Sequence, residues 1–457
     1  MTPTESRAAF SLAGIFSLRM LGLFMIYPVF TFYAEHLAGS TPTTVGLALG
    51  AYGLTQALLQ IPFGFASDRI GRKRMIAIGL LIFAGGSVVA ALSTTIYGVI
   101  FGRILQGAGA VGSTILALNA DLTREESRTK AMATIGLTIG LAFALALVAG
   151  PVINAWAGVP GIFWFTAVLA ILGIGVLYLV TPTPANIRSH RDTQAVPELF
   201  GRVLADRELL RLDFAIFALH AILTASFIAL PSMLRTVLGI HQDWQWVVYL
   251  PTLAVSVAIM VPAIIVAESK RQMKPVFVAS VAVLCIAPGI LAFYRDSLVE
   301  ILVLLTLFFA AFNIMEASLP SLISKVAPAD AKGTAMGIYS SSQFFGIFVG
   351  GTVGGWAYGQ FGTGGVFGFA ALVGLIWLVI AAGMPKPRFA RSHMVNVGAI
   401  SDHEARRLAA EIEAVEGVFE AVVVPADQVA YIKFDGRVVE PDVLNRFAPS
   451  HSTPAPA

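Results

Sequence analysis

Charged residues are scarce in this sequence. Only 12% of its 457 residues are Asp, Glu, Lys or Arg, while 57% are hydrophobic. Soluble globular domains carry about 25% charged residues. The composition therefore argues against a soluble protein and indicates an integral membrane protein, with the lipid bilayer as its first partner.

Cysteine is almost absent, since Cys285 is the only one and lies within a hydrophobic run. A single cysteine excludes an intrachain disulfide and argues against thiolate metal or redox sites. The phosphate-binding pattern G-x-x-x-x-G-K-[ST] does not occur, so direct use of ATP is not expected. We expect no enzyme, no cofactor, no metal and no nucleic-acid partner.

Long hydrophobic runs dominate the first 385 residues. Each is long enough to cross about 30 Å of hydrocarbon. They predict an all-α membrane part of twelve helices in two six-helix bundles, 1–180 and 211–385, joined by a polar connector, 181–210. The predicted helices are 10–34, 43–66, 75–94, 96–119, 131–155, 160–180, 211–236, 244–267, 273–293, 297–322, 331–358 and 363–383.

Lysine and arginine are distributed unevenly between the predicted loops. With the N-terminus inside, the inner segments up to the last helix carry eighteen of these residues and the outer loops carry two. By the positive-inside rule, both termini are cytoplasmic in a multi-pass protein of a bacterial-type inner membrane.

The two halves repeat. Ile15-Phe-Ser-Leu-Arg19 corresponds to Ile216-Phe-Ala-Leu-His220, and Arg128-Thr-Lys-Ala-Met corresponds to Lys332-Gly-Thr-Ala-Met, at offsets of 201 and 204 residues. A repeat of this kind is typical of transporters built from two related bundles.

The composition changes after the last predicted helix. Residues 392–457 carry ten acids and five bases, a net charge of −5, whereas the preceding residues carry +8. The pattern predicts a β-α-β-β-α domain at 392–448, with Asp402 as helix N-cap, which resembles a small ferredoxin-like domain. Residues 449–457 are expected to be a disordered tail. The acidic domain is expected to dock on the basic cytoplasmic loops, the alternative being an independently tumbling appendage.

The loop between predicted helices 2 and 3 reads G-x-x-x-D-R-x-G-R-K-R. One glycine permits close helix approach and the other a reversal with positive φ. This loop resembles the signature loop of the major facilitator superfamily, which implies a gating role; a solvated structural turn is the alternative. The residues of this gating motif are Gly64, Asp68, Arg69, Gly71, Arg72 and Lys73.

Two further motifs resemble that superfamily. Arg103 and Gln106 form R-x-x-Q-G-x-G in predicted helix 4, where the alternative is an arginine that reaches out of the bilayer. Gly150 and Pro151 resemble part of an antiporter motif in predicted helix 5, where ordinary close packing is the alternative. Asp121 and Arg128 are expected to join a cytoplasmic charge network around the gating motif.

Three ionisable residues lie at similar predicted depth: Arg19, His220 and Glu316. The resemblance implies that helices 1, 4, 7 and 10 line a central cavity, so these residues are expected to face it. An acid and a histidine in a wet cavity suggest proton coupling, with a structural ion pair as the alternative.

The helical part is similar to the YajR-type branch of this superfamily, which is classed with drug:proton antiporters. The resemblance implies export of small amphipathic molecules in exchange for protons. The residues Phe24, Tyr27, Phe30 and Tyr33, spaced by three, are expected to place aromatic rings along one side of predicted helix 1. These rings suit such substrates if that side lines the cavity, the alternative being ordinary packing against a neighbouring helix. The alternatives are a nutrient or metabolite carrier of the same fold and a membrane sensor that does not transport.

Overall fold

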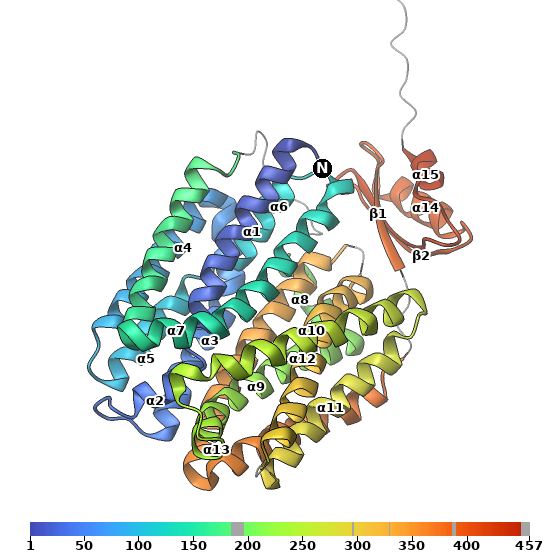
Figure 1. The fold of residues 1–457 in the computed structure, drawn as a ribbon. Helices are drawn as coiled ribbons and strands as arrows, with labels where there is room; N and C mark the ends of the chain where they lie inside the picture. Colours follow the sequence, from blue (N-terminus) through green and yellow to red (C-terminus); the bar gives the residue numbers. More distant parts are fainter. Residues whose placement is uncertain (184–195, 295–296, 329, 386–389, 449–457) are drawn as a thin grey trace, which may run out of the picture.

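The helices of the membrane part form two bundles that lie side by side, with a small α/β domain beyond one end (Figure 1). A computed structural model describes residues 1–183, 196–294, 297–328, 330–385 and 390–448. We call the end of the bundles next to this domain the domain end, and the opposite end the far end. The first half contains α1 (Pro3–Phe24), α2 (Phe30–Ala34), α3 (Pro42–Ile70), α4 (Arg72–Leu92), α5 (Ile96–Ala108), α6 (Gly112–Asp121) and α7 (Glu125–Leu179). The connector contains η1 (Pro197–Leu199) and α8 (Phe200–Ala205), and the second half contains α9 (Arg207–Thr236), η2 (Gln242–Trp244), α10 (Trp246–Ser269), α11 (Met273–Phe293), α12 (Leu298–Val326) and α13 (Lys332–Ala382).

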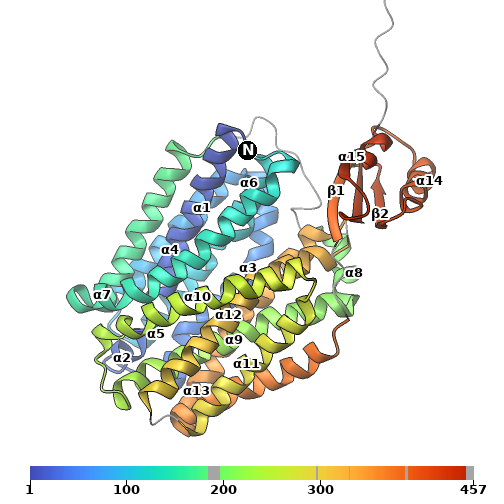
Figure 2. The same ribbon diagram turned by 45° about the vertical axis from the view of Figure 1, so that its right-hand side comes forward.

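Ten helical segments of the described chain are long and apolar enough to cross a membrane. Two helices, α7 and α13, are 55 and 51 residues long and contain one glycine each with non-helical angles, Gly158 and Gly362. Figure 2 shows both helices turning back on themselves. These two breaks support the predicted twelve spans, although the exact count stays a prediction.

The ends of α3 follow from local sequence. Thr41 caps the helix by accepting a hydrogen bond from Thr44 N–H, and Pro42 occupies the first turn, where its missing N–H costs nothing. Gly71 separates α3 from α4 with φ of +101°, a conformation that glycine adopts without strain. The predicted reversal at Gly71 is confirmed.

The first predicted helix, 10–34, is interrupted. Helix α1 ends at Phe24, the chain turns over residues 25–29, and α2 begins at Phe30. Pro28 lies in this turn and has no N–H to continue a helix. The expected alignment of the four aromatic residues along one side of a continuous helix is therefore wrong.

Glycines allow α13 to lie directly against α9 and α3. A Cβ added at Gly346 would lie 2.2 Å from the Phe217 carbonyl oxygen of α9. On α3, a Cβ added at Gly46 would lie 2.2 Å from the Gly351 carbonyl oxygen and 2.7 Å from Gly355 Cα. These contacts join backbone to backbone, and those of α3 join the two halves.

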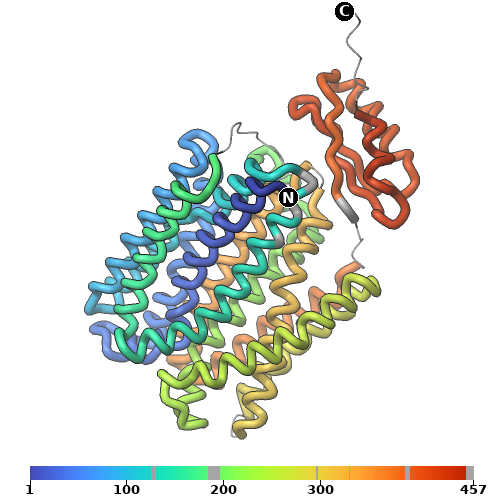
Figure 3. The backbone as a smooth tube through the Cα atoms, turned by 45° about the horizontal axis from the view of Figure 1, so that its top comes forward, coloured from blue at the N-terminus to red at the C-terminus, as the bar shows by residue number. Residues whose placement is uncertain are grey.

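The small domain, which Figure 3 shows beyond the domain end of the bundles, contains a three-stranded antiparallel sheet in the order β1-β3-β2. Its apolar core lies between this sheet and two short helices. The N-cap of its first helix is Ser401, not Asp402 as predicted, because the Ser401 hydroxyl accepts from Glu404 N–H in a capping box. The elements are β1 (Ala390–Asn396), α14 (Asp402–Glu413), β2 (Val418–Val424), β3 (Val429–Asp435), α15 (Pro441–Leu444) and η3 (Asn445–Phe447).

Candidate functional site

The gating motif is organised around Arg72, whose side chain is 2% exposed. Its Nη1 lies 2.5 Å from Asp68 Oδ1 and donates to Ser67 Oγ at 2.6 Å, and its Nε lies 3.1 Å from Asp121 Oδ2. The structure therefore brings Asp68, Arg72 and Asp121 together, as the sequence predicted. A buried arginine held by two carboxylates fixes the end of α3 against α4 and α6.

The other motif residues lie around this centre. Lys73 Nζ donates to the Thr181 carbonyl at 2.6 Å, and Arg69 is exposed. A Cβ at Gly64 would lie 3.5 Å from Ser113 Oγ, which is an ordinary contact. The prediction that close helix approach requires glycine at this position is therefore wrong. The side chain of Arg128 lies outside the described part of the structure.

Residues of both halves line a cleft at the domain end, which we call the gate cleft. One wall comes from α3, α4 and α6, and the other comes from the first turns of α13. Its polar lining faces the N-terminus of a membrane helix, where unpaired N–H groups lie. The lining residues include Gln60, Gly64, Asp68, Arg72, Ser113, Gly333, Met336 and Ser340.

Arg103 lies inside the first bundle. It is fully buried, donates to Gln106 Oε1 at 2.7 Å and to the Ala48 carbonyl at 3.2 Å, and its guanidinium lies 5.1 Å from the Tyr52 ring centroid. Gln106 Nε2 in turn donates to Ser87 Oγ at 2.7 Å. The alternative of an arginine that reaches out of the bilayer is therefore wrong.

Arg19 is also buried in the first bundle. Its Nη2 donates to the Tyr52 hydroxyl and to Gln56 Oε1, while Nε and Nη1 have no hydrogen-bond partner among the described residues. The guanidinium lies 5.7 Å from the Phe83 ring centroid. The predicted grouping of Arg19 with His220 and Glu316 does not appear in these contacts, because Arg19 packs within its own bundle.

His220 and Glu316 do lie together in the second bundle, with His220 Nε2 3.7 Å from Glu316 Oε2. The Ile216 carbonyl can only accept, so His220 Nδ1, 3.2 Å away, carries the proton, and Nε2 accepts from Gln343 Nε2 at 2.9 Å. Glu316 Oε2 has no hydrogen-bond partner in the described structure. A protonated His220 would bind Glu316 at this distance after a small movement.

Aromatic rings connect the two halves beside this pair. The ring centroids of Phe24 and Phe143 are 5.0 Å apart, and those of Phe143 and Phe312 are 5.9 Å apart. Phe312 lies 6.0 Å from the ring of His220. Phe143 of α7 thus meets the second half beside His220, with Phe24 packed behind it in the first half.

The halves are closed against each other at the far end. Tyr27 contacts Phe227 with ring centroids 5.5 Å apart, and Asn154 Nδ2 donates to Asp243 Oδ1 at 3.0 Å. A Cβ added at Gly150 would lie 2.1 Å from the Met25 carbonyl oxygen. Gly150 and Pro151 therefore serve close packing of α7 on the end of α1 in this structure.

Comparison with known proteins identifies the family. The sequence profile of the Major Facilitator Superfamily matches residues 12–273 and 245–398. The chain is 45% identical to the inner membrane transport protein YajR of Escherichia coli over 448 residues, which covers 98% of this chain and 97% of that protein. The chain belongs to the major facilitator superfamily.

This superfamily member is also similar to another curated protein and shares its fold with a solved structure. It is 27% identical to the multidrug resistance protein MdtH of Aeromonas hydrophila, over 79% of this chain and 87% of that protein. The solved structure of a bacterial homologue of the human lysosomal transporter Spinster, inward-facing and occupied, shares its fold with a TM-score of 0.68 and 15% identity, over 84% of this chain and 96% of that chain. This superfamily member is a membrane transporter rather than an enzyme, and its described part contains no cluster of three metal-ligating side chains.

Asp213 of α9 is a buried acid that no sequence motif marks. It is 6% exposed, and neither carboxylate oxygen has a hydrogen-bond partner among the described residues. It lies in the first turn of the predicted helix, 211–236, where an acid is easily taken for a helix-capping residue. Asp206 is the actual cap of α9, since its Oδ1 accepts from Glu208 N–H and Leu209 N–H.

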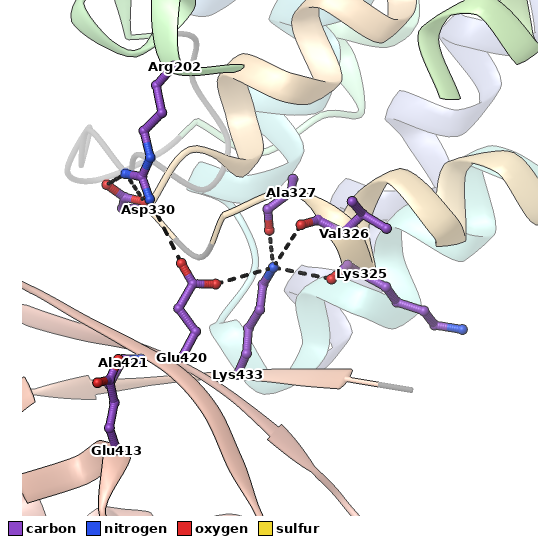
Figure 4. Close-up of polar contacts among 9 residues, drawn as sticks. All are labelled: Arg202, Lys325, Val326, Ala327, Asp330, Glu413, Glu420, Ala421 and Lys433. Carbon is purple, nitrogen blue, oxygen red and sulfur yellow. Dashed lines mark hydrogen bonds and ion pairs between the residues drawn. The ribbon is translucent and has the colours of Figure 1, made fainter. Parts of the chain in front are cut away.

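Lys433, which no sequence motif marks either, joins the C-terminal domain to α12 (Figure 4). Its Nζ contacts the carbonyl oxygens of Lys325, Val326 and Ala327, the first two at 3.2 and 3.3 Å. These are the last carbonyls of the helix, which lack partners within it and favour a cation. Burial lowers the pKa of Lys433, and nearby Glu420 opposes this shift.

Ionic contacts extend this interface. Glu420 Oε2 lies 3.6 Å from Lys433 Nζ, and its other oxygen lies 3.9 Å from Arg202 of α8. Arg202 also binds Asp330, in the segment between α12 and α13, at 3.0 Å. At a second point, Arg271 Nη2 lies 3.1 Å from both carboxylate oxygens of Asp435. All these contacts are with the connector or the second half.

Proposed function

We propose that this transporter exports small amphipathic molecules in exchange for protons by alternating access. The observation that supports this most directly is the pair of Glu316 and His220, 3.7 Å apart, beside an aromatic contact between the two halves. An ionisable group inside a membrane protein is expensive and marks an ion or substrate pathway by default. The multidrug resistance protein among its relatives gives the substrate class independent support.

We further propose that the domain end faces the cytoplasm of a cell with a bacterial-type inner membrane, with both termini on that side. The eighteen to two excess of Lys and Arg in the inner segments supports this orientation. The far-end closure and the gate cleft then correspond to an inward-facing arrangement.

The coupling chemistry rests on Glu316. Alternating access changes how much of the Glu316 carboxyl group is exposed to water and how much of it contacts His220 and apolar side chains. These surroundings decide whether the carboxyl group holds a proton. Proton uptake on the outer side and proton release on the cytoplasmic side would drive the change between the outward-facing and inward-facing states. Substrate leaves in the opposite direction.

Proton-coupled export is tested with inverted membrane vesicles that contain the protein and an acidic interior. Two amphipathic dyes, ethidium and Nile red, should accumulate inside the vesicles. A pH-sensitive dye should report that protons leave the vesicle interior as either of these dyes enters. Accumulation without any change in pH would support an uncoupled carrier of the same fold. A protein that binds these dyes, as shown by a thermal shift, but moves neither dye nor protons would be a sensor.

Asp68 is proposed to act in the gate. In this structure it binds Arg72, across the gate cleft from the first turns of α13. When the cleft closes, the carboxylate would meet the free N–H groups and partial positive charge of the α13 N-terminus, and so stabilise the outward-open state.

Asp68→Asn should therefore shift the protein toward the inward-facing state, since it keeps the shape and removes the charge. A loss of about 1 kcal/mol at the helix terminus changes the population ratio about fivefold. Spin labels on the two walls of the cleft would measure the open fraction. An unchanged distance distribution would contradict the gating role, and Asp427→Asn in the C-terminal domain is the control for the substitution itself.

We also propose that the C-terminal domain stays docked on the second half in the membrane. A charged hydrogen bond contributes about 2 kcal/mol, and Lys433 reaches three carbonyl groups in a buried position. The exposed pair of Arg271 and Asp435 adds a smaller, salt-sensitive term. We propose that the C-terminal domain regulates or stabilises the transporter.

Lys433→Met is expected to release the domain, because methionine fits a strand but offers no donor to the α12 carbonyls. Proteolysis between the last membrane helix and the domain should become faster by about tenfold for a loss of 1.4 kcal/mol. Arg437→Met is the matched control, since it removes the same charge from an exposed position of the same domain. Equal cleavage rates in the two variants would show that Lys433 does not hold the domain.

A further inference from the structure

Asp213 is a buried acid for which the proposed coupling pair leaves no role. It is 6% exposed on α9, and neither of its oxygens accepts a hydrogen bond in the described structure. No ion pair to Asp213 occurs among the described residues. An unpaired carboxyl group in a membrane helix costs several kcal/mol, so its presence calls for a function.

Asp213 lies on the same face of α9 as His220. The two residues are seven positions apart, two helical turns or roughly 10 Å along the axis, with Asp213 nearer the domain end. His220 in turn lies 3.7 Å from Glu316 of α12. Asp213 is therefore placed between the coupling pair and the domain end.

Helix α13 supplies a hydroxyl beside this path. Gly346 and Gly350 of α13 lie against Phe217 and Ala221 of α9, so the two helices run in parallel with a constant offset. The preceding turns of α13, which include Tyr339, thus lie along the part of α9 that carries Asp213. Tyr339 is 3% exposed, and its hydroxyl also lacks a hydrogen-bond partner among the described residues.

Gln343, one helical turn after Tyr339 on α13, lies 2.9 Å from His220 Nε2, beside Glu316. The same pairing of α13 with α9 places Tyr339 within about one turn of Asp213. With His220, the side chains of Asp213, Glu316 and Tyr339 are the titratable groups that carry this argument on α9, α12 and α13. The other charged pair near the start of α9, Glu208 and Arg211, is closed on itself at 2.5 Å. Glu316, Tyr339 and Asp213 each have a side-chain oxygen without a hydrogen-bond partner among the described residues. They form a series from the coupling pair toward the domain end.

We propose that Asp213 receives the proton that Glu316 releases and passes it to water at the domain end. The Glu316 carboxyl group gives its proton to the Tyr339 oxygen while the Tyr339 hydroxyl gives its own to the Asp213 carboxylate, directly or through water. Glu316 is left as a carboxylate, Tyr339 is unchanged and Asp213 is a neutral acid, which then loses the proton to water. This inference rests on the proposed proton coupling at Glu316.

The test needs only protons as the ligand. Infrared difference spectra of the protein in lipid nanodiscs, recorded after a jump from acid to alkaline pH, follow the loss of each protonated carboxyl band. Glu316→Gln and Asp213→Asn assign the two bands. In Asp213→Asn, loss of the Glu316 band should be slower by about tenfold or more, with its final amplitude unchanged. Tyr339→Phe should slow it in the same way.

Glu208→Gln is the control, because it changes an acid of the same helix outside the path. A purely structural role for Asp213 would lower thermal stability without altering the rate of Glu316 deprotonation. An unchanged rate in Asp213→Asn overturns the relay while leaving coupling at Glu316 intact. If Glu316→Gln shows the same carboxyl bands as the native protein, Glu316 does not titrate and the proposed coupling itself fails.

Discussion

Gly46→Ala is expected to hold the transporter open at the far end. The new Cβ would lie 2.2 Å from the Gly351 carbonyl oxygen and 2.7 Å from Gly355 Cα. Both are backbone atoms of α13, so no side chain can rotate away to make room. Overpacking costs about 1–3 kcal/mol, which disfavours the closed far end by about fivefold to more than a hundredfold.

A crosslinking experiment measures this shift. Cysteines replacing Asn154 and Asp243, whose side chains form a hydrogen bond across the far end, should be joined by a short bifunctional reagent only when that end is closed. The background is Cys285→Ser, since Cys285 is the only native cysteine. Crosslinking should fall strongly in Gly46→Ala.

Gly85→Ala is the matched control for this substitution. A Cβ at Gly85 meets nothing within 4 Å, so alanine there should leave crosslinking unchanged or slightly stabilise α4. If Gly46→Ala crosslinks as well as the control, then α3 and α13 do not seal the far end.

Glu316→Gln is expected to abolish pH-driven transport and to preserve binding. The amide keeps the size of the side chain and its place 3.7 Å from His220, but it cannot carry a proton through the cycle. Dye accumulation in inverted vesicles should become independent of interior pH, while the thermal shift caused by the same dye remains.

The same change at Glu300 provides the control, because this exposed acid lies at the other end of α12. Glu300→Gln should transport like the native protein over the whole pH range. Full pH dependence in Glu316→Gln would leave Glu316 a structural residue and would remove the basis of proton coupling.

Local chemistry made part of this molecule predictable. Gly71 has a role that depends only on its own backbone, and the strand and helix order of the C-terminal domain follows from short periodic patterns. The charge triad of Asp68, Arg72 and Asp121 was predictable because the gating motif contains Asp68 and Arg72, and Asp121 lies in the charged segment after predicted helix 4.

Other features depend on contacts between distant segments. Lys433 contacts carbonyls more than 100 positions away, and no local pattern distinguishes it from an ordinary strand lysine. Arg19 and Glu316 have suitable depth, but depth alone does not say which face of a helix points to which bundle. The buried setting of Asp213 arises from α12 and α13 and leaves no mark in its own helix.

The position of the C-terminal domain has a practical consequence for imaging. A transporter of two similar bundles looks nearly the same after half a turn about the membrane normal, and detergent or lipid hides most of its outline. With its contacts confined to the connector and the second half, a docked domain is a rigid landmark on one side of that pseudo-symmetry. It would allow single-particle images of this 48.4 kDa chain to be aligned without a bound antibody fragment, and loss of that landmark in Lys433→Met would be visible in the class averages.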